Sequence, residues 1–314
     1  MKPNTNIQNY PIFIDGKFYE NNTDIFPSLN PHNEEIWATF SVAGKSEVDL
    51  AIAAARRCLN EGEWPKMLAS DRGKLLLKLA DLVELHANEI GKIETNDSGK
   101  LLAETATQTQ YVAEYYRYFA GLADKIQGST LPIDKPDMHV FTSCEPIGVV
   151  AAVVPWNAQM FLTATKLAPA LAAGCTIIIK ASEIAPCSLL YFARLIKEAG
   201  IPDGVVSVIT GDEKNCAIPL TTHPDIDRIA FTGGPKVAKQ IVINSSENFA
   251  VTTLELGGKS PIVVFEDADI EGAVNGIIAG NYGASGQSCV AGTRVIVHES
   301  IKRELIEILS KRAE

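Results

Sequence analysis

Hydrophobic and polar positions alternate in blocks through the second half of the chain. From Gly148 onward, short apolar runs such as VVAAVV, TIII and VVSVI are separated by segments whose apolar residues recur at helical spacing. Apolar strands separated by helices are typical of a parallel sheet that is covered on both faces. The pattern therefore predicts an α/β fold with a doubly wound parallel sheet.

The first third of the chain is predicted to be mainly helical. Helical spacing extends over residues 46–59, 70–95 and 104–126, and Ser46 is a candidate N-cap of the first of these helices. Between Gly128 and Pro146 the pattern changes to the alternating segment MHVFTSCEP. This segment predicts either a hairpin that projects from the body or a plain edge strand.

The chain beyond FTGG continues in the same alternation. A helix over PKVAKQIVINSS is followed by the strands TTLELGG and PIVVF, a helix that starts near Asp267, the strand RVIVH and a last helix over SIKRELIEILSKRAE. The length of 314 residues is consistent with about two domains.

Composition and charge exclude several classes of function. A chain that is 46% hydrophobic and 21% charged is an ordinary soluble globular mixture. The formal charge of −10 and the absence of a basic run argue against nucleic acid as a partner. The N-terminus has no leader pattern and the longest apolar run is too short for a bilayer, so we expect a cytoplasmic protein with no membrane partner.

The cysteines and histidines indicate neither disulfides nor a metal site. Six cysteines without a CxxC pair are typical of reduced thiols. None of the five histidines is spaced as HExxH, so no metal ligand is predicted.

Polar and small residues follow the predicted strands, where open α/β sheets bind their ligands. After the strand GVVAAVVP comes PWN with Asn157, and after TIII comes KASE with Lys180 and Glu183. Gly211 follows VVSVIT, and FTGG, which contains Gly233 and Gly234, follows RIA.

Each of these residues has a functional and a structural interpretation. Glu183, with Lys180, is placed to bind a ribose hydroxyl, which favours NAD over NADP, or it complements the dipole of a solvated helix start. Gly233 and Gly234 lie at a strand-to-helix turn that either faces a phosphate or only reverses the chain, and they lack the GxGxxG spacing. Asn157 is either an amide donor to an oxyanion or a turn residue.

The segment GASGQSCVAGTR contains the candidate nucleophile. The Cys289 thiol can attack an electrophilic carbon, and its own backbone N–H can serve the resulting oxyanion, because small residues precede it. The alternative is an inert buried thiol. Glu255 in LELGG is a candidate base for a water molecule, or else pairs with Lys259.

Taken together and in this order, PWN, KLAPALAAGCTIIIKASE, AFTGG, LELGGKSP and GQSCVAGTR resemble the aldehyde dehydrogenase superfamily. The resemblance runs from about Phe13 to the last residue. It implies NAD(P)-dependent oxidation of an aldehyde to a carboxylic acid through a Cys289 thiohemiacetal and thioester. The Asn157 amide and the Cys289 N–H would hold the oxyanion, and Glu255 would activate the water that hydrolyses the thioester.

The resemblance also implies a cofactor site and a domain division. The presence of both Glu255 and Cys289 favours the hydrolytic branch over the CoA-acylating one. A cofactor-binding domain would span 1–127 and 147–256, an oligomerisation arm 128–146, and an incomplete catalytic domain 257–314, in a family whose members form homo-oligomers. The nucleotide would lie against Pro155, Trp156, Lys180, Glu183, Gly211, Phe231, Thr232, Gly233, Gly234, Leu256 and Gly257.

The sequence departs from the family pattern at a few positions and in length. Gly234 stands where a Ser is common, Ala238 where a Gly often closes the loop, and Ala284 where an Asn is frequent. Family members usually continue for well over a hundred residues beyond this point, so we expect a chain truncated at its C-terminus. Two hypotheses follow: a working NAD-dependent aldehyde dehydrogenase, or a catalytically silent fragment that at most binds nucleotide.

Overall fold

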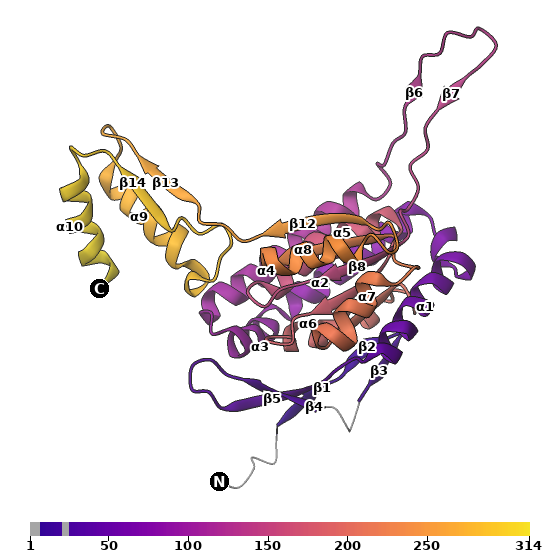
Figure 1. Cartoon of the computed structure of the whole chain (residues 1–314), viewed down its shortest axis with the longest axis horizontal. Helices are drawn as coiled ribbons and strands as arrows, with labels where there is room; N and C mark the ends of the chain where they lie inside the picture. Colours follow the sequence, from indigo (N-terminus) through magenta and orange to yellow (C-terminus); the bar gives the residue numbers. More distant parts are fainter. Residues whose placement is uncertain (1–6, 21–24) are drawn as a thin grey trace. The chain divides into compact units, whose positions relative to one another are not determined.

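The computed structural model describes residues 7–20 and 25–314, and the chain divides into two compact units. The first unit comprises the chain to Thr232 together with Lys236–Leu254. The second comprises Gly233–Pro235 and Glu255–Glu314. Figure 1 shows the elements of both units in chain order.

A seven-stranded sheet forms the centre of the first unit. Its four central strands are parallel, and a short antiparallel hairpin completes one edge. The fold is therefore the predicted α/β class with a parallel core. In spatial order the strands are β12 (Val251–Leu256), β11 (Arg228–Gly233), β8 (Val149–Val153), β9 (Thr176–Ala181), β10 (Val206–Thr210), β2 (Ile12–Ile14) and β3 (Lys17–Tyr19).

Helices cover both faces of this sheet, as a doubly wound fold requires. The crossovers through α5 (Gln159–Ala173) and α6 (Cys187–Glu198) place these helices on one face, against β9 and β10. The crossover back to β11 runs in the opposite direction and places α7 (Ile218–Thr222) on the other face, where it contacts α1 (Lys45–Glu61). A further helix, α8 (Pro235–Asn244), follows β11.

The predicted helix over 70–95 is wrong in one respect, because it is two helices. α2 (Ala69–Leu85) ends and α3 (Ala87–Ser98) begins at His86, whose φ of −96° and ψ of 11° are not helical. Both helices bury apolar residues at helical spacing, so the pattern continues across the break. α4 (Leu102–Leu122) packs against both of them, and α2 and α4 also contact α5.

The predicted N-cap of α1 is also wrong. Gly44 is the N-cap, and its backbone N–H donates to Glu47 Oε2 at 2.8 Å, while Ser46 lies inside the first turn. The Glu47 side chain therefore supplies the half of a capping box in which the N3 residue accepts from the N-cap N–H.

Strands, and not helices, occupy most of the described residues before α1. Besides β2 and β3, a separate three-stranded sheet has the order β1-β5-β4, from β1 (Gln8–Tyr10), β5 (Ile36–Ser41) and β4 (Ile25–Leu29). The prediction of a mainly helical first third is wrong for these residues, because strands of three to six residues are too short to show a clear period.

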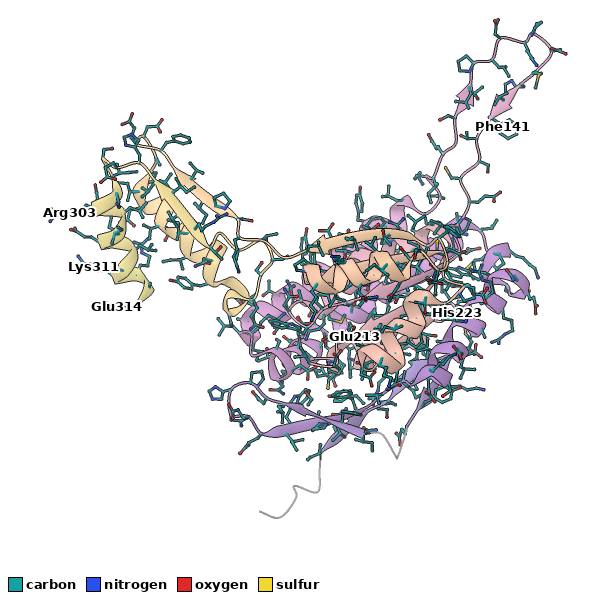
Figure 2. All side chains as sticks on the ribbon, viewed as in Figure 1. Phe141, Glu213, His223, Arg303, Lys311 and Glu314 are labelled. Atoms are coloured by element: carbon teal, nitrogen blue, oxygen red, sulfur yellow. The ribbon has the colours of Figure 1, made fainter. Side chains whose placement is uncertain are left out.

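Residues 128–146 form a long hairpin. Its strands β6 (Thr130–Leu131) and β7 (Val140–Phe141) pair antiparallel with each other and not with the main sheet. Figure 2 shows Phe141 on this hairpin, where its side chain is 69% exposed. Of the two predicted forms of this segment, the structure shows the hairpin; its role in assembly stays a prediction.

The second unit is small and has its own apolar core. β13 (Pro261–Val264) pairs parallel with β14 (Arg294–Val297), and α9 (Ile270–Tyr282) and α10 (Lys302–Ala313) complete it. The core residues are Val264, Val274, Ile277 and Leu305. The helix expected near Asp267 begins at Ile270, with Asp269 as its N-cap. Across residues 7–20 and 25–314, no helix is long and apolar enough to cross a membrane.

Candidate active site

The carboxyl ends of four parallel strands lie in one row in the first unit. Phe231 is opposite Val153, Val153 is opposite Lys180, and Lys180 is opposite Ile209. Because these strands run in the same direction, the residues that follow them emerge at the same edge of the sheet. The structure thus brings together the segments that carry Asn157, Glu183, Gly211 and Thr232.

This edge contains the point at which the winding of the sheet reverses. The chain passes from β8 outward through β9 to β10 and then returns to place β11 on the other side of β8. Ligands of open α/β sheets bind in the crevice at such a reversal, outside the carboxyl ends of the strands. Asn157 follows β8 and Thr232 lies on β11, so the chain carries both residues at this reversal.

Lys180 and Glu183 form an ion pair at the end of β9. Lys180 is only 6% exposed, and its Nζ lies 2.8 Å from Glu183 Oε2, while half of the Glu183 side chain is open to solvent. Glu183 precedes the Pro186 N-cap of α6 by three residues and so lies outside that helix. The pairing with Lys180 accounts for its position better than the predicted alternative, a complement to the helix dipole.

The glycines at the strand ends have different surroundings. A Cβ on Gly211 would lie 2.6 Å from the Ala43 carbonyl oxygen and 2.8 Å from Cys216 Cβ, so close packing alone requires a glycine there. Gly233 ends β11, and a Cβ on Gly234 would meet nothing within 4 Å. The backbone at Gly234 is therefore open to a ligand at the start of α8.

The segment after β8 is partly open to solvent. Trp156 is 38% exposed, Pro155 and Asn157 are half-buried, and α5 begins two residues after Asn157, at Gln159. The position of the Asn157 amide therefore depends on how the first turn of α5 is held.

Lys166 is a residue of this region that the sequence analysis missed. It lies on α5, and its Nζ donates to Thr232 Oγ1 at 2.7 Å and to the Leu162 carbonyl at 3.3 Å. Phe231 and Thr232 are both buried, so Lys166 fixes a buried hydroxyl at the end of β11. The available signal was that this lysine is the one charged residue of the helix QMFLTATKLAPALAA.

In the second unit, Cys289 follows a turn with unusual backbone angles. Ala284, Ser285 and Gly286 have φ values of 54°, 57° and 74°, and two of these residues carry a Cβ that the left-handed region disfavours. The LELGG turn lies against Cys289, because a Cβ on Gly258 would be 3.3 Å from the Cys289 carbonyl oxygen. A glycine there lets the two segments approach closely.

Exposure separates Cys289 from most of the other thiols. Cys58, Cys175, Cys187 and Cys216 are buried, and burial raises the pKa of each of these thiols, that of Cys216 to about 12. A protonated buried thiol is a poor nucleophile. Cys144 and Cys289 are exposed, so the predicted alternative of an inert buried thiol does not hold for Cys289.

Glu255 is exposed near the end of β12 and is followed by the exposed Leu256 and Gly257. Within residues 7–20 and 25–314, no ion pair joins Glu255 to Lys259, so the predicted pairing alternative is not observed. The carboxylate of Glu255 is therefore accessible to water.

Comparison with known proteins decides the family. The aldehyde dehydrogenase family profile matches residues 18–314. A protein of Acinetobacter baylyi, (Z)-2-((N-methylformamido)methylene)-5-hydroxybutyrolactone dehydrogenase, is 54% identical over 308 residues, which cover 98% of this chain. The chain belongs to the aldehyde dehydrogenase family. The predicted resemblance is confirmed.

Solved structures of aldehyde dehydrogenases share the fold. The NAD+ complex of the Bacillus cereus aldehyde dehydrogenase matches with a TM-score of 0.94 at 40% identity and covers 98% of this chain. Benzaldehyde dehydrogenase of Antirrhinum majus is 39% identical over the whole chain. The chain spans 63% of the length of the Acinetobacter protein and 62% of the Bacillus cereus chain.

Proposed function

We propose that this chain carries the residues for NAD-dependent oxidation of an aldehyde to a carboxylic acid by covalent catalysis at Cys289. The observation that carries the proposal is the accessible thiol of Cys289, which lies beside the LELGG turn. In the same chain, the carboxyl ends of four parallel strands lie in one row. Membership of the aldehyde dehydrogenase family supports the same chemistry.

Cys289 acts first. Its thiolate forms a C–S bond to the aldehyde carbon, and the carbonyl π electrons move to the oxygen. The Asn157 side-chain amide and the Cys289 backbone N–H donate to this oxyanion. NAD, when bound, would supply the acceptor for the hydride that leaves the same carbon. Loss of the hydride leaves an acyl group on Cys289 as a thioester.

Glu255 acts second. Its carboxylate takes a proton from water while the water oxygen attacks the thioester carbon. The C–S bond breaks, the Cys289 thiolate is released, and the product leaves as a carboxylic acid, which gives its remaining proton to solvent. The accessibility of Glu255 supports this role.

The residues at the strand ends suit an NAD molecule. Glu183 has half of its side chain exposed and is oriented by the buried Lys180, so its carboxylate can accept hydrogen bonds from ribose hydroxyls. The same negative charge repels a 2′-phosphate, which favours NAD over NADP. The open backbone at Gly234 suits a phosphate at the start of α8, and Pro155, Trp156, Gly211, Phe231, Thr232, Gly233, Leu256 and Gly257 complete the proposed site.

The substrate class is proposed from the most informative relative. The Acinetobacter protein is named for a 5-hydroxybutyrolactone. A lactone with a hydroxyl on that carbon is the ring-closed form of an aldehyde that also bears a carboxylate. We therefore propose short aldehydes with a carboxylate as the first substrates to test, alongside aromatic ones.

The direct test is NADH absorbance from the purified chain with NAD and this aldehyde panel. We expect signal from the native chain and from Cys144→Ala, the matched control at the other exposed thiol, and none from Cys289→Ala. Equal signal from Cys289→Ala would refute the nucleophile assignment. No signal from a folded native chain would favour the fragment that at most binds nucleotide.

A further inference from the structure

Helix α3 carries two buried carboxylates on one side. Glu94 and Asp97 are three residues apart, so they lie on the same side of the helix, and they are only 1% and 2% exposed. Buried carboxylates are rare and carry a large desolvation cost unless other groups compensate it. Their partners therefore indicate what these carboxylates do.

Glu94 reaches the first turn of α5. Its Oε2 accepts a long hydrogen bond of 3.5 Å from the backbone N–H of Met160, the second residue of that helix. α5 has no cap of its own, because its N-cap is Ala158. A carboxylate at a helix N-terminus stabilises the unpaired N–H groups and the positive end of the dipole.

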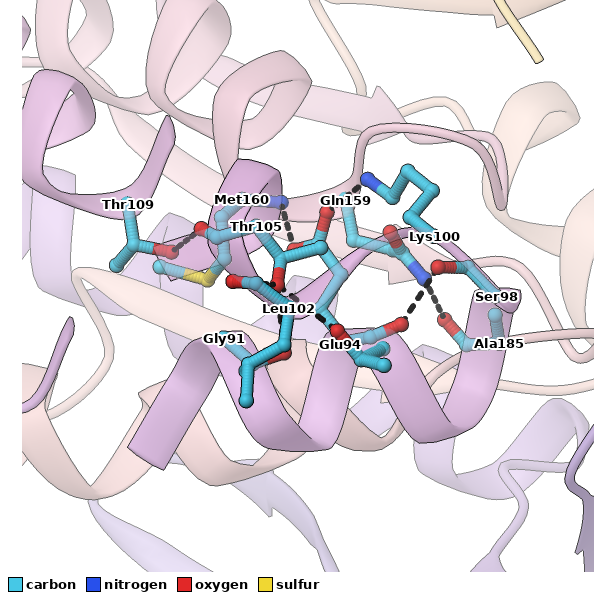
Figure 3. Close-up of polar contacts among 11 residues, drawn as sticks. Gly91, Glu94, Ser98, Lys100, Leu102, Thr105, Thr109, Gln159, Met160 and Ala185 are labelled. Carbon is cyan, nitrogen blue, oxygen red and sulfur yellow. Dashed lines mark hydrogen bonds and ion pairs between the residues drawn. The ribbon is translucent and has the colours of Figure 1, made fainter. Parts of the chain in front are cut away.

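Lys100 neutralises Glu94 inside the protein. Its Nζ donates to Glu94 Oε1, and the two side chains are 2% and 1% exposed. Figure 3 shows Glu94 on α3 between Lys100 and the start of α5. A buried ion pair adds little net stability compared with an apolar pair of the same volume, so stability alone does not explain its presence.

Asp97 makes the corresponding contact with α6. Its Oδ2 accepts from the backbone N–H of Cys187 at 2.7 Å, and its Oδ1 accepts from Ser28 Oγ at 2.6 Å. α6 also lacks a capping side chain of its own, since its N-cap is Pro186. The first turns of α5 and α6 are thus both held by α3.

A third contact joins the start of α5 to the segment before α6. Gln159, the first residue of α5 and fully buried, donates from Nε2 to the Ala185 carbonyl at 3.3 Å. Ala185 lies between Glu183 and α6, so this bond links the Asn157 segment to the Glu183 segment. Figure 3 shows this contact beside Glu94 and Lys100.

We propose that Glu94, with Lys100, and Asp97 are positioning residues: they fix the first turns of α5 and α6 and thereby hold Asn157 and Glu183 in place at the strand ends. Asn157 precedes α5 by two residues and Glu183 precedes α6 by four. The consequence for catalysis rests on the proposed function, whereas the consequence for the two helix starts does not.

Two double variants isolate the Glu94 cap. Glu94→Leu with Lys100→Met removes both charges and the cap, whereas Glu94→Gln with Lys100→Met removes both charges but keeps an oxygen that can accept from Met160. Neither leaves a buried unpaired charge, so both are expected to fold. Ile90→Val, a fully buried position on the same helix, is the control for general loosening of α3.

The first measurement is amide hydrogen exchange in the 314-residue chain, which needs no activity. In the Leu variant we expect exchange in peptides covering 157–163 to rise about tenfold over the native chain, with the Gln variant and Ile90→Val close to native. For the Asp97 contact with α6, Asp97→Ala should raise exchange in peptides covering 185–191. Asp97→Asn should keep exchange there much closer to native. Equal exchange in the Leu and Gln variants would overturn the proposal for Glu94, and equal exchange in Asp97→Ala and Asp97→Asn would overturn it for Asp97.

The second measurement is the single-turnover rate of NADH formation. The Leu variant should lose rate in the native background but little further rate when combined with Asn157→Ala, since the amide that it positions is already absent. Full additivity would show that the pair does not act through Asn157. If the native chain forms no NADH while exchange changes as expected, the positioning holds and the proposed activity fails.

Discussion

At the residue scale, the accessible carboxylate of Glu255 gives a direct prediction for the second half of the reaction. Glu255→Gln keeps the shape of the side chain but cannot accept the proton from water. We expect one rapid turnover of NADH followed by steady-state turnover that is lower by about 10²–10⁴-fold. Stopped-flow absorbance measures both phases, with Glu304→Gln on the surface of α10 as the matched control. Steady-state turnover at the native rate would contradict the role of Glu255.

The charge of Glu183 gives a prediction for cofactor choice. Glu183→Gln removes the repulsion of a 2′-phosphate and weakens hydrogen bonds to ribose hydroxyls, because a charged acceptor is the stronger one. We expect the preference for NAD over NADP to fall by about 10-fold or more, from the difference between charged and neutral hydrogen bonds. Calorimetric titration with both nucleotides measures it, with Glu247→Gln as the control. An unchanged preference would show that Glu183 does not contact this ribose.

At the scale of elements, the Asp97 contact between α3 and α6 makes stability depend on pH. Burial raises the pKa of Asp97 from 3.8 to about 6, and the negative charge of Glu94 acts in the same direction. Hydrogen bonds from Ser28 and from the Cys187 backbone N–H and thiol oppose the increase, and the phenol of Tyr10 lies within electrostatic range. The folded protein therefore holds the Asp97 proton more tightly than the unfolded chain does.

The sign of the pH effect follows from this difference. Between about pH 4 and pH 6 the folded state binds more protons at this site, so the contribution of Asp97 to the free energy of unfolding falls by about 3 kcal/mol as the pH rises through that window. Asp97→Asn cannot titrate and should lose this part of the pH dependence. Urea unfolding at pH 4, 5, 6 and 7 gives the free energy of unfolding of both proteins. If that free energy depends on pH in the same way in the native chain and in Asp97→Asn, the pKa of Asp97 is not raised.

The sequence predicts some elements better than others for identifiable reasons. The strands β8 to β11 are apolar and bounded by polar or small residues, so their ends, and hence Asn157, Lys180 and Glu183, are predictable from the chain itself. The break between α2 and α3 is not, because the apolar period continues across His86. The short strands before α1 depend on pairing with distant segments, and a local pattern does not carry that information.

At the scale of the whole molecule, the ion pair proposed to bind the ribose and the proposed nucleophile belong to different units. Lys180 and Glu183 lie in the first unit and Cys289 in the second. We expect Cys289→Ala to leave the NAD dissociation constant within about twofold of native. Lys180→Met should weaken binding by about tenfold, through the loss of a charged partner that orients Glu183. Calorimetric titration with NAD measures the dissociation constant of both variants. Weaker binding in Cys289→Ala would show that the thiol contributes to nucleotide binding.

The residues that the sequence analysis missed all act over long sequence separations. Lys166 reaches Thr232, Glu94 reaches Met160 and Asp97 reaches Cys187. Cys289 was found because small residues precede it, and Glu255 because LELGG occurs in order with the other motifs of the family resemblance. Contacts that hold a site are properties of the packed molecule, and a single sequence read in local windows does not reveal them.

The measurement that tests the central claim most directly is the intact mass of Glu255→Gln after mixing with NAD and a substrate aldehyde. We expect the mass to increase by that of one acyl group, and peptide mapping to locate the group on Cys289, because the thioester forms but is hydrolysed slowly. Cys289→Ala combined with Glu255→Gln should show no increase. An acyl group on another residue, or NADH formation with no acylated chain, would contradict covalent catalysis at Cys289.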